Sequence, residues 1–158
     1  MRWGEGIEMF LTDANLFLWE ILDMLPEPER SKVTPPPGKT MEEVKEEVIQ
    51  FLSEAEDRIS ITDFNLHSLG IMFFRLSLHS QFIALAHRLR DRVISLSPED
   101  FERLAEVSFQ FNLDFDDAYQ YVAAEKYNCE IVSFDSDFDR TDKGRLTPQQ
   151  ALERLMRK

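Results

Sequence analysis

Short apolar segments that alternate with longer amphipathic segments are the feature of this sequence that most limits its fold. Four of these segments have the length and side-chain character of strands, and they lie at 9–11, 58–62, 92–96 and 130–134. Parallel strands need crossover connections, which the intervening segments can supply as helices. The sequence therefore predicts an α/β fold with three layers, α/β/α, around a central, mainly parallel sheet of about four to five strands.

Helical patterns fill most of the chain between these strands. The expected helices are 16–25, 41–56, 63–90 with a split near 77–80, one that opens at 97–100, 114–127, and a last one that begins after 147. Five of the seven prolines fall within 26–39, which predicts a surface loop. A chain of 158 residues fits one domain, with residues 1–8 as an N-terminal extension and Met9 as the expected natural start.

Aspartates gather at the carboxyl ends of the predicted strands, where the functional groups of a parallel sheet collect. The set consists of Asp13 after the first strand, Asp63 after the second, Asp116 and Asp117 at the start of the helix before the fourth, and Asp135 and Asp137 after the fourth. Carboxylates in close proximity repel one another unless a cation neutralises them. Oxygen ligands favour Mg²⁺ or Mn²⁺, so the pattern predicts a site for one of these ions.

Each acid also has an ordinary structural interpretation. Asp13 and Asp63 could be N-caps at strand-to-helix turns. Asp114, Asp116 and Asp117 could stabilise a helix through its N-terminal dipole. Taken singly, each acid is better explained in this way.

The net charge of −12 excludes a generic basic protein that coats nucleic acid. The acidic excess is local, because 41–57 and 98–117 each carry seven acids, whereas 73–90 carries none. Arg75, Arg140 and Lys143 are therefore the candidates for contacting a phosphate backbone, and a solvated helix face is the alternative.

The single cysteine, Cys129, cannot form an internal disulfide and lacks neighbours at zinc-site spacing. No apolar stretch reaches the ~20 residues that a bilayer span needs. We therefore expect a cytoplasmic protein without a membrane segment.

Three motifs taken together resemble the PIN domain family, and within it the VapC-like toxin ribonucleases. The first is Asp13-Ala14-Asn15 after a short strand, and the second is the helix start at 113–118, which contains Asp117-Ala118. The third is the strand end at 133–138, Ser-Phe-Asp-Ser-Asp-Phe. The resemblance covers nearly the whole chain from Met9 onward.

The resemblance implies a role for each matching residue. Asp13, Asp117 and Asp135 would be the metal-holding acids, with Asp137 as an auxiliary acid. Asn15 and Ser133, together with Asp116, would support them.

The middle motif departs from the family, which usually carries a glutamate in the helix after the second strand. The window 63–68 has none, so Asp63, Asn65 or His67 must substitute, or the site is weakened. Asp63 is the only carboxylate in that window, and we expect it to be the fourth catalytic acid. A shift of one helical turn would place His67 there instead.

The implied function is metal-dependent hydrolysis of RNA, as the toxin of a type II toxin–antitoxin pair with a cognate antitoxin. The resemblance also implies a homodimer, and the apolar stretch 71–78 is our candidate for part of the interface. One alternative is a catalytically weak PIN-like module that binds a protein or RNA partner. A metal-dependent phosphatase or a phospho-acceptor domain is a further alternative, although no late strand-end lysine supports the latter.

Overall fold

A computed structural model describes residues 8–157, and the expected N-terminal extension at 1–8 lies outside this range except for Glu8. The central sheet has four strands, β1 (Phe10–Thr12), β2 (Ile59–Thr62), β3 (Val93–Ile94) and β4 (Glu130–Val132). Their order is β3-β2-β1-β4, and every neighbouring pair is parallel. The predicted parallel α/β sheet is thereby confirmed.

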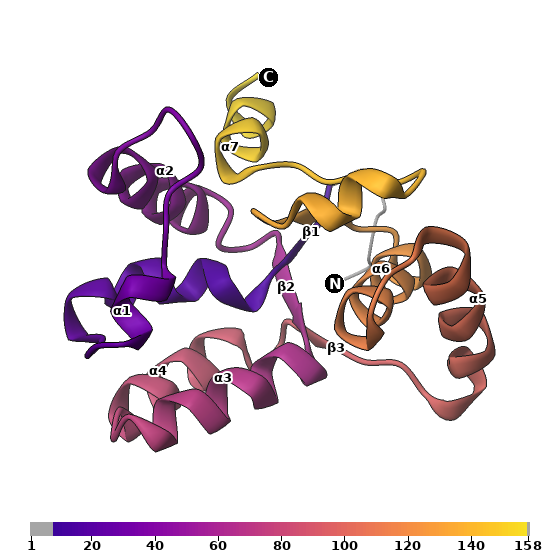
Figure 1. The fold of residues 1–158 in the computed structure, drawn as a ribbon, viewed down its shortest axis with the longest axis horizontal. Helices are drawn as coiled ribbons and strands as arrows, with labels where there is room; N and C mark the ends of the chain where they lie inside the picture. Colours follow the sequence, from indigo (N-terminus) through magenta and orange to yellow (C-terminus); the bar gives the residue numbers. More distant parts are fainter. Residues whose placement is uncertain (1–7, 158) are drawn as a thin grey trace.

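Helices connect the strands and cover the sheet on both sides (Figure 1). They are the 3-10 segments η1 (Ala14–Met24), η2 (Pro98–Asp100) and η3 (Ser136–Arg140), and the α-helices α1 (Glu29–Lys32), α2 (Met41–Glu54), α3 (Asp63–Arg75), α4 (His79–Leu89), α5 (Phe101–Phe111), α6 (Phe115–Tyr127) and α7 (Pro148–Met156). In Figure 1, α1 to α4 lie to the left of the strands and α5 and α6 to the right.

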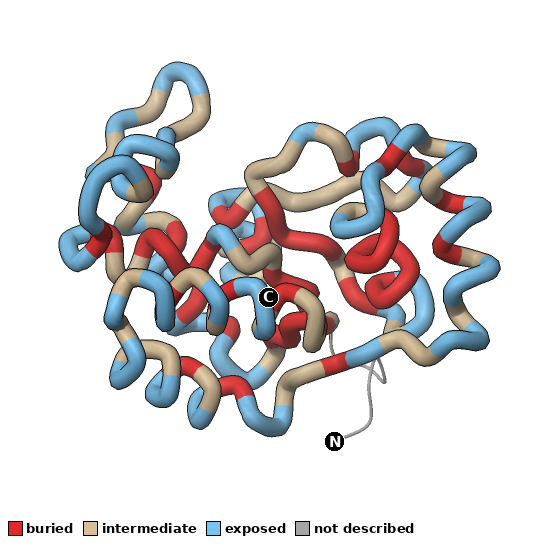
Figure 2. The backbone as a smooth tube through the Cα atoms, turned by 60° about the horizontal axis from the view of Figure 1, so that its bottom comes forward, coloured by how far each residue is buried: buried red, intermediate tan, exposed pale blue. Residues whose placement is uncertain are grey.

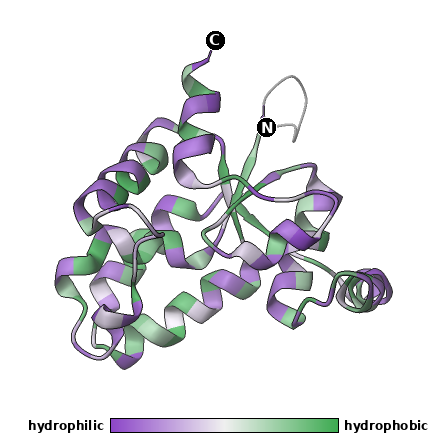
Figure 3. Cartoon of the chain, turned by 45° about the horizontal axis from the view of Figure 1, so that its top comes forward, coloured by the Kyte–Doolittle hydropathy of each residue, from purple (hydrophilic) through white to green (hydrophobic). Residues whose placement is uncertain are grey.

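Successive strand residues point to opposite faces of the sheet, which creates two separate apolar cores. Phe10 and Ile61 pack on one face against η1, α2, α3, α4 and α7. Leu11 and Ile131 pack on the other face against α6 and η3. Figure 2 shows the buried strands in the interior of the molecule. Figure 3 shows the same strands as apolar segments between amphipathic helices. The three-layer prediction is confirmed by this arrangement.

Sequence signals for helix starts are confirmed at two places, because Ser97 and Thr147 each form a capping box, with Asp100 and Gln150 respectively. Thr40 forms a further capping box at the start of α2, which the sequence analysis did not predict. The expected break in the helical region 63–90 lies at 76–78, between α3 and α4.

Some predicted elements are shorter or differ in type. The predicted strand 92–96 has only two strand residues, because the backbone N–H of Leu96 donates to the Tyr119 hydroxyl (3.0 Å) instead of a strand partner. The predicted helix 16–25 is a 3-10 segment with non-helical backbone angles at Ile21, and the proline-rich loop contains the one-turn helix α1.

Within residues 8–157, no helix combines the length and the apolar character needed to cross a lipid bilayer.

A substitution at Phe51 tests the packing of the apolar core between the sheet and α2. Its side chain is fully buried and meets the ring of Phe10 edge to face at 5.5 Å. We expect Phe51→Ala to lower the free energy of unfolding by about 3–5 kcal/mol, measured by chemical denaturation, because it leaves a cavity. Ile49→Ala on the same helix is the matched control, since Ile49 is 40% exposed and should change that free energy by less than about 1 kcal/mol. Similar losses in the two variants would contradict this packing.

Candidate metal centre

Parallel pairing of β1 with β4 brings two acidic segments to the same edge of the sheet. Thr12 lies opposite Val132 at the ends of these strands, and the backbone N–H of Asp13 donates to the Val132 carbonyl at 3.0 Å. The chain then passes through Ser133 to Asp135. Helix α6 leads back into β4, so its N-terminus, which carries Asp117, lies at this same edge.

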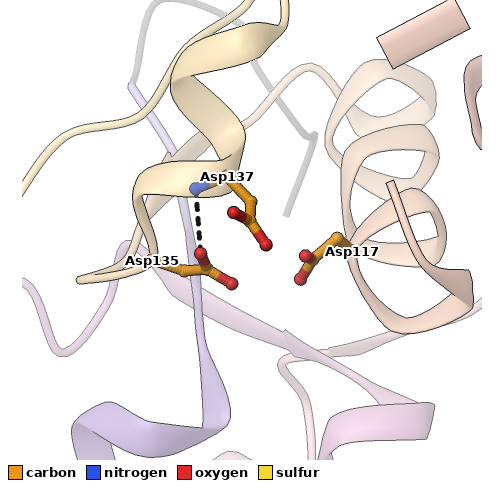
Figure 4. Close-up of side chains that lie close together, drawn as sticks. All are labelled: Asp117, Asp135 and Asp137. Atoms are coloured by element: carbon orange, nitrogen blue, oxygen red, sulfur yellow. Dashed lines mark hydrogen bonds between the residues drawn. The ribbon is translucent and has the colours of Figure 1, made fainter. Parts of the chain in front are cut away.

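Three carboxylates converge here from two segments of the chain (Figure 4). Asp117, Asp135 and Asp137 each offer an oxygen, and these oxygens lie within 4.8 Å of one another. A local cap holds one of them, because the backbone N–H of Asp137 donates to the Asp135 carboxylate at 2.9 Å. The backbone N–H of Asp117 donates to the carboxylate of Asp114, also at 2.9 Å, and this bond fixes the start of α6 rather than the Asp117 side chain.

Asp13 adjoins this group through Ser133. The buried Ser133 hydroxyl donates to Asp13 Oδ2 at 2.7 Å and accepts from the backbone N–H of Asp135 at 2.9 Å. Asp13 is also the N-cap residue of η1, as its ordinary structural interpretation predicts, although its side chain makes no regular cap hydrogen bond there. Among the described residues, the set whose oxygens converge does not include Asp13, which lies one hydroxyl group away.

Burial and mutual repulsion both affect the pKa values of these acids. Partial burial, followed by the charges of Asp135, Asp114, Asp137 and Asp13, raises the pKa of Asp117 to about 7. Burial also raises the pKa of Asp13, and the Ser133 hydrogen bond offsets part of that rise. A divalent cation would remove the repulsion, and an all-oxygen donor set fits Mg²⁺ or Mn²⁺.

The structure places the middle-motif candidates differently from our expectation. Asp63 accepts a hydrogen bond from the Tyr119 hydroxyl at 2.7 Å and lies outside the converging group, so it ties α3 to α6. The N-cap of α3 is Thr62 rather than Asp63, and His67 is exposed. Asn65 is the inward-facing member of the window, because its buried amide donates to Gln120 Oε1 at 3.1 Å.

Tyr119 and Gln120 are site neighbours that the sequence analysis missed. Gln120 lies one helical turn after Asp117 on α6, and its buried Nε2 has no hydrogen-bond partner among the described residues. The sequence does carry a signal for Asn65, the partner of Gln120, because the Thr62-x-x-Asn65 spacing is typical of a helix N-cap. In the structure the Thr62 hydroxyl accepts from the Asn65 backbone N–H at 3.0 Å and fixes the start of α3.

The remaining predicted residues are distributed around the group. Arg140 donates to Asp137 at 3.0 Å and to the carbonyls of Phe111 and Asn112, so it anchors η3 to the end of α5. Asn15 and Arg75 line a cavity that adjoins Asp135.

Two predicted residues lie away from the converging oxygens. Asp116 is exposed at the start of α6 and is not one of the three acids. Lys143 exerts its charge on Glu125 and Cys129.

The chain was compared with family models, curated protein sequences and solved structures. The family model described as PIN domain matches residues 40–144. No curated protein sequence is significantly similar to the chain.

Solved structures share the fold at low sequence identity. A toxin–antitoxin complex from Klebsiella pneumoniae aligns with a TM-score of 0.64 and 16% identity, over 87% of this chain and 96% of its own. The structure of FitAB bound to an IR36 DNA fragment aligns with a TM-score of 0.66 and 14% identity, over 89% of this chain and 96% of its own. FitAcB from Neisseria gonorrhoeae aligns with a TM-score of 0.62 and 13% identity, over 89% of this chain and 98% of its own. These likenesses support the same α/β/α arrangement.

Asp117 should destabilise the metal-free protein at neutral pH. Its pKa is 3.8 when unperturbed and about 7 in the folded chain, so the folded state binds more protons between these values and loses stability as pH rises through them. We expect Asp117→Asn to raise Tm at pH 8 by about 2–4 °C, which corresponds to about 1 kcal/mol once solvent screening is considered. The gain should vanish near pH 4.

Thermal unfolding in a chelator at the two pH values measures this effect. Glu46→Gln is the control, because Glu46 is an exposed acid on α2 and lies outside the converging group. A wild type more stable than Asp117→Asn at pH 8 would show that repulsion is absent.

Proposed function

Because this chain belongs to the PIN domain family, whose members are nucleases, we propose that it is a metal-dependent endoribonuclease that hydrolyses RNA phosphodiester bonds. One observation carries this proposal, namely the three carboxylates whose oxygens lie within 4.8 Å of one another at the carboxyl edge of the sheet. Such a group is costly without a cation, and a hard cation beside an open edge is suited to phosphate chemistry.

Asp117, Asp135 and Asp137 would hold the metal, with Asp13 as a fourth acid beside them. Mg²⁺ or Mn²⁺ in this place neutralises phosphate charge and lowers the pKa of a bound water. Ser133 positions Asp13 and the backbone of Asp135 through its two hydrogen bonds. Arg140 holds Asp137 and at the same time offsets part of its charge.

Asp63 has a positioning role in this proposal. Its carboxylate holds the Tyr119 hydroxyl, which also accepts from the Leu96 backbone, so α3, α6 and the end of β3 meet at one phenol. Tyr119 is two residues after Asp117 in α6. Asp63 therefore fixes the rotation of the helix that presents Asp117, rather than acting as the fourth catalytic acid.

Metal binding and RNA cleavage test the site together. We expect wild-type protein to bind Mn²⁺ saturably in a calorimetric titration, and Asp13→Asn and Asp135→Asn to weaken that binding at least about tenfold. Mn²⁺-dependent cleavage of single-stranded RNA should fall at least about 100-fold in the same variants. Asp116→Asn, which changes an exposed acid outside the group, should keep both properties.

A binding module with little catalysis is the second candidate. The observation in its favour is that Asn65, paired with Gln120, brings a neutral amide where the related family carries a carboxylate. This candidate is supported if the folded wild type binds Mn²⁺ but cuts no RNA, and it is excluded by robust turnover that Asp135→Asn abolishes. Metal-independent cleavage would contradict both candidates.

We further propose that the chain is the toxin of a toxin–antitoxin pair. The support is structural, since one matched structure is described as a toxin–antitoxin complex and covers 87% of this chain. Expression of the wild type in a bacterial host should slow growth, and Asp135→Asn should not. Growth arrest by both proteins would point to toxicity unrelated to the acidic group.

An exposed apolar patch on α3 and α4 supports a homodimer. Ile71 is 61% exposed, Ile83 is 50% exposed, and Phe74 is 49% exposed while its ring contacts His79. Large apolar side chains left exposed on neighbouring helices are typical of an interface. The patch includes two residues of the 71–78 stretch.

Sedimentation velocity tests the dimer. We expect a dimer for the wild type and a shift toward monomer for Phe74→Glu, which introduces charge at the centre of the patch. Phe109→Glu is the control, because Phe109 is 93% exposed on α5 and lies outside the patch. A monomeric wild type, or an equal shift in the two variants, would contradict this interface.

A further inference from the structure

A cavity of about 480 Å³ opens next to the acidic group. Four separate segments enclose it: the first half of η1, the proline-rich connection around α1, the C-terminal half of α3, and the residues after β4. Asp135 belongs both to the converging carboxylates and to the wall of this cavity. A molecule seated in the cavity would therefore reach directly to the acids.

Apolar and aromatic side chains form one part of the cavity wall, and polar groups form the rest. Trp19 lines the cavity and packs against the ring of Phe134 with centroids 6.0 Å apart. Met72 of α3 and Leu76, which directly follows this helix, also line the cavity. Pockets of roughly 300–1,000 Å³ that combine apolar walls with polar groups are typical of small-molecule sites.

Two cations line the cavity without an acidic partner. The side chains of Lys32 and Arg75 make no ion pair or hydrogen bond with another described residue. This contrasts with Arg88, Arg140 and Arg145, each of which binds a carboxylate. In a chain with a net charge of −12, two cations left open beside an apolar pocket indicate an anionic ligand. Glu29 also lines the cavity and can accept a hydrogen bond from an amino group.

We propose that this cavity binds the nucleotide that neighbours the cleaved phosphate of a single-stranded RNA. The base occupies the apolar interior beside Phe134, and the phosphate of the same nucleotide lies against Lys32 and Arg75. The inference rests on the proposed nuclease function and adds to it the residues that select the base next to the cut. A base enters such a pocket when it is unpaired and unstacked.

Tryptophan fluorescence measures this binding without any cleavage. The chain has two tryptophans, so Trp3→Phe leaves Trp19 in the cavity wall as the only one. In chelator, without metal, we expect 5′-mononucleotides to change this fluorescence saturably, and inorganic phosphate alone to do so weakly or not at all. Arg75→Gln and Lys32→Gln in the same background should each weaken mononucleotide binding roughly five- to tenfold.

Arg90→Gln is the matched control, because Arg90 is an exposed arginine that pairs with Asp91 and lies outside this cavity. Its binding constant should equal that of the Trp3→Phe background. No saturable response to any mononucleotide, or equal losses in the control, would overturn the proposal. Saturable binding of an acidic, phenylalanine-containing peptide in place of nucleotides would assign the cavity to a protein partner and likewise overturn it.

Cleavage products provide a second readout that separates the two proposals. Thr34 is an exposed wall residue on the loop after α1, so Thr34→Tyr should narrow the cavity without disturbing the core. We expect this variant to retain Mn²⁺ binding and to change the base found next to the cut at least about fivefold. An unchanged base preference with intact cleavage would reject the nucleotide pocket alone. Absence of wild-type cleavage, with nucleotide binding intact, would reject the nuclease function but leave the pocket.

Discussion

The parallel pairing of β1 with β4 is the contact on which the acidic group depends. It sets the register in which Thr12 faces Val132, and that register brings Asp13 and the segment after β4 to one edge. The Ser133 hydroxyl then connects the two segments by donating to one acid and accepting from the backbone of the other. Because a hydroxyl can donate and accept at once, one buried serine fixes the relative position of both.

Like charges at this edge oppose folding, and the fold withstands them because stabilisation comes from elsewhere. Two apolar cores flank the sheet, and the residues that form them are among the most buried in the chain. The cost of the acids is local and appears as the raised pKa of Asp117. A site that is destabilised without its ligand is a common consequence of function, because the same repulsion becomes binding energy when a cation arrives.

Particular residues show what local sequence patterns indicate and what they cannot indicate. Asp117, Asp135 and Asp137 follow directly from motifs, because strand ends and a helix start have known positions in a parallel sheet. Asp63 has the same sequence signature, yet its side chain is bound by Tyr119, which is 56 residues away. No pattern of local spacing reports such a partner. Likewise, Arg140 looks like a free cation in the sequence but has three acceptors in the structure.

The sequence by itself determined most of the elements, the parallel sheet and the set of candidate acids, because periodicity, caps and strand-end composition act over a few residues. Tertiary structure decided which of those acids converge, which arginines remain unpaired, and that a cavity forms beside Asp135. The reason is physical. Local preferences depend on neighbours in the chain, whereas carboxylate proximity, charge pairing and cavity shape depend on segments that meet only when the sheet and its helices are assembled.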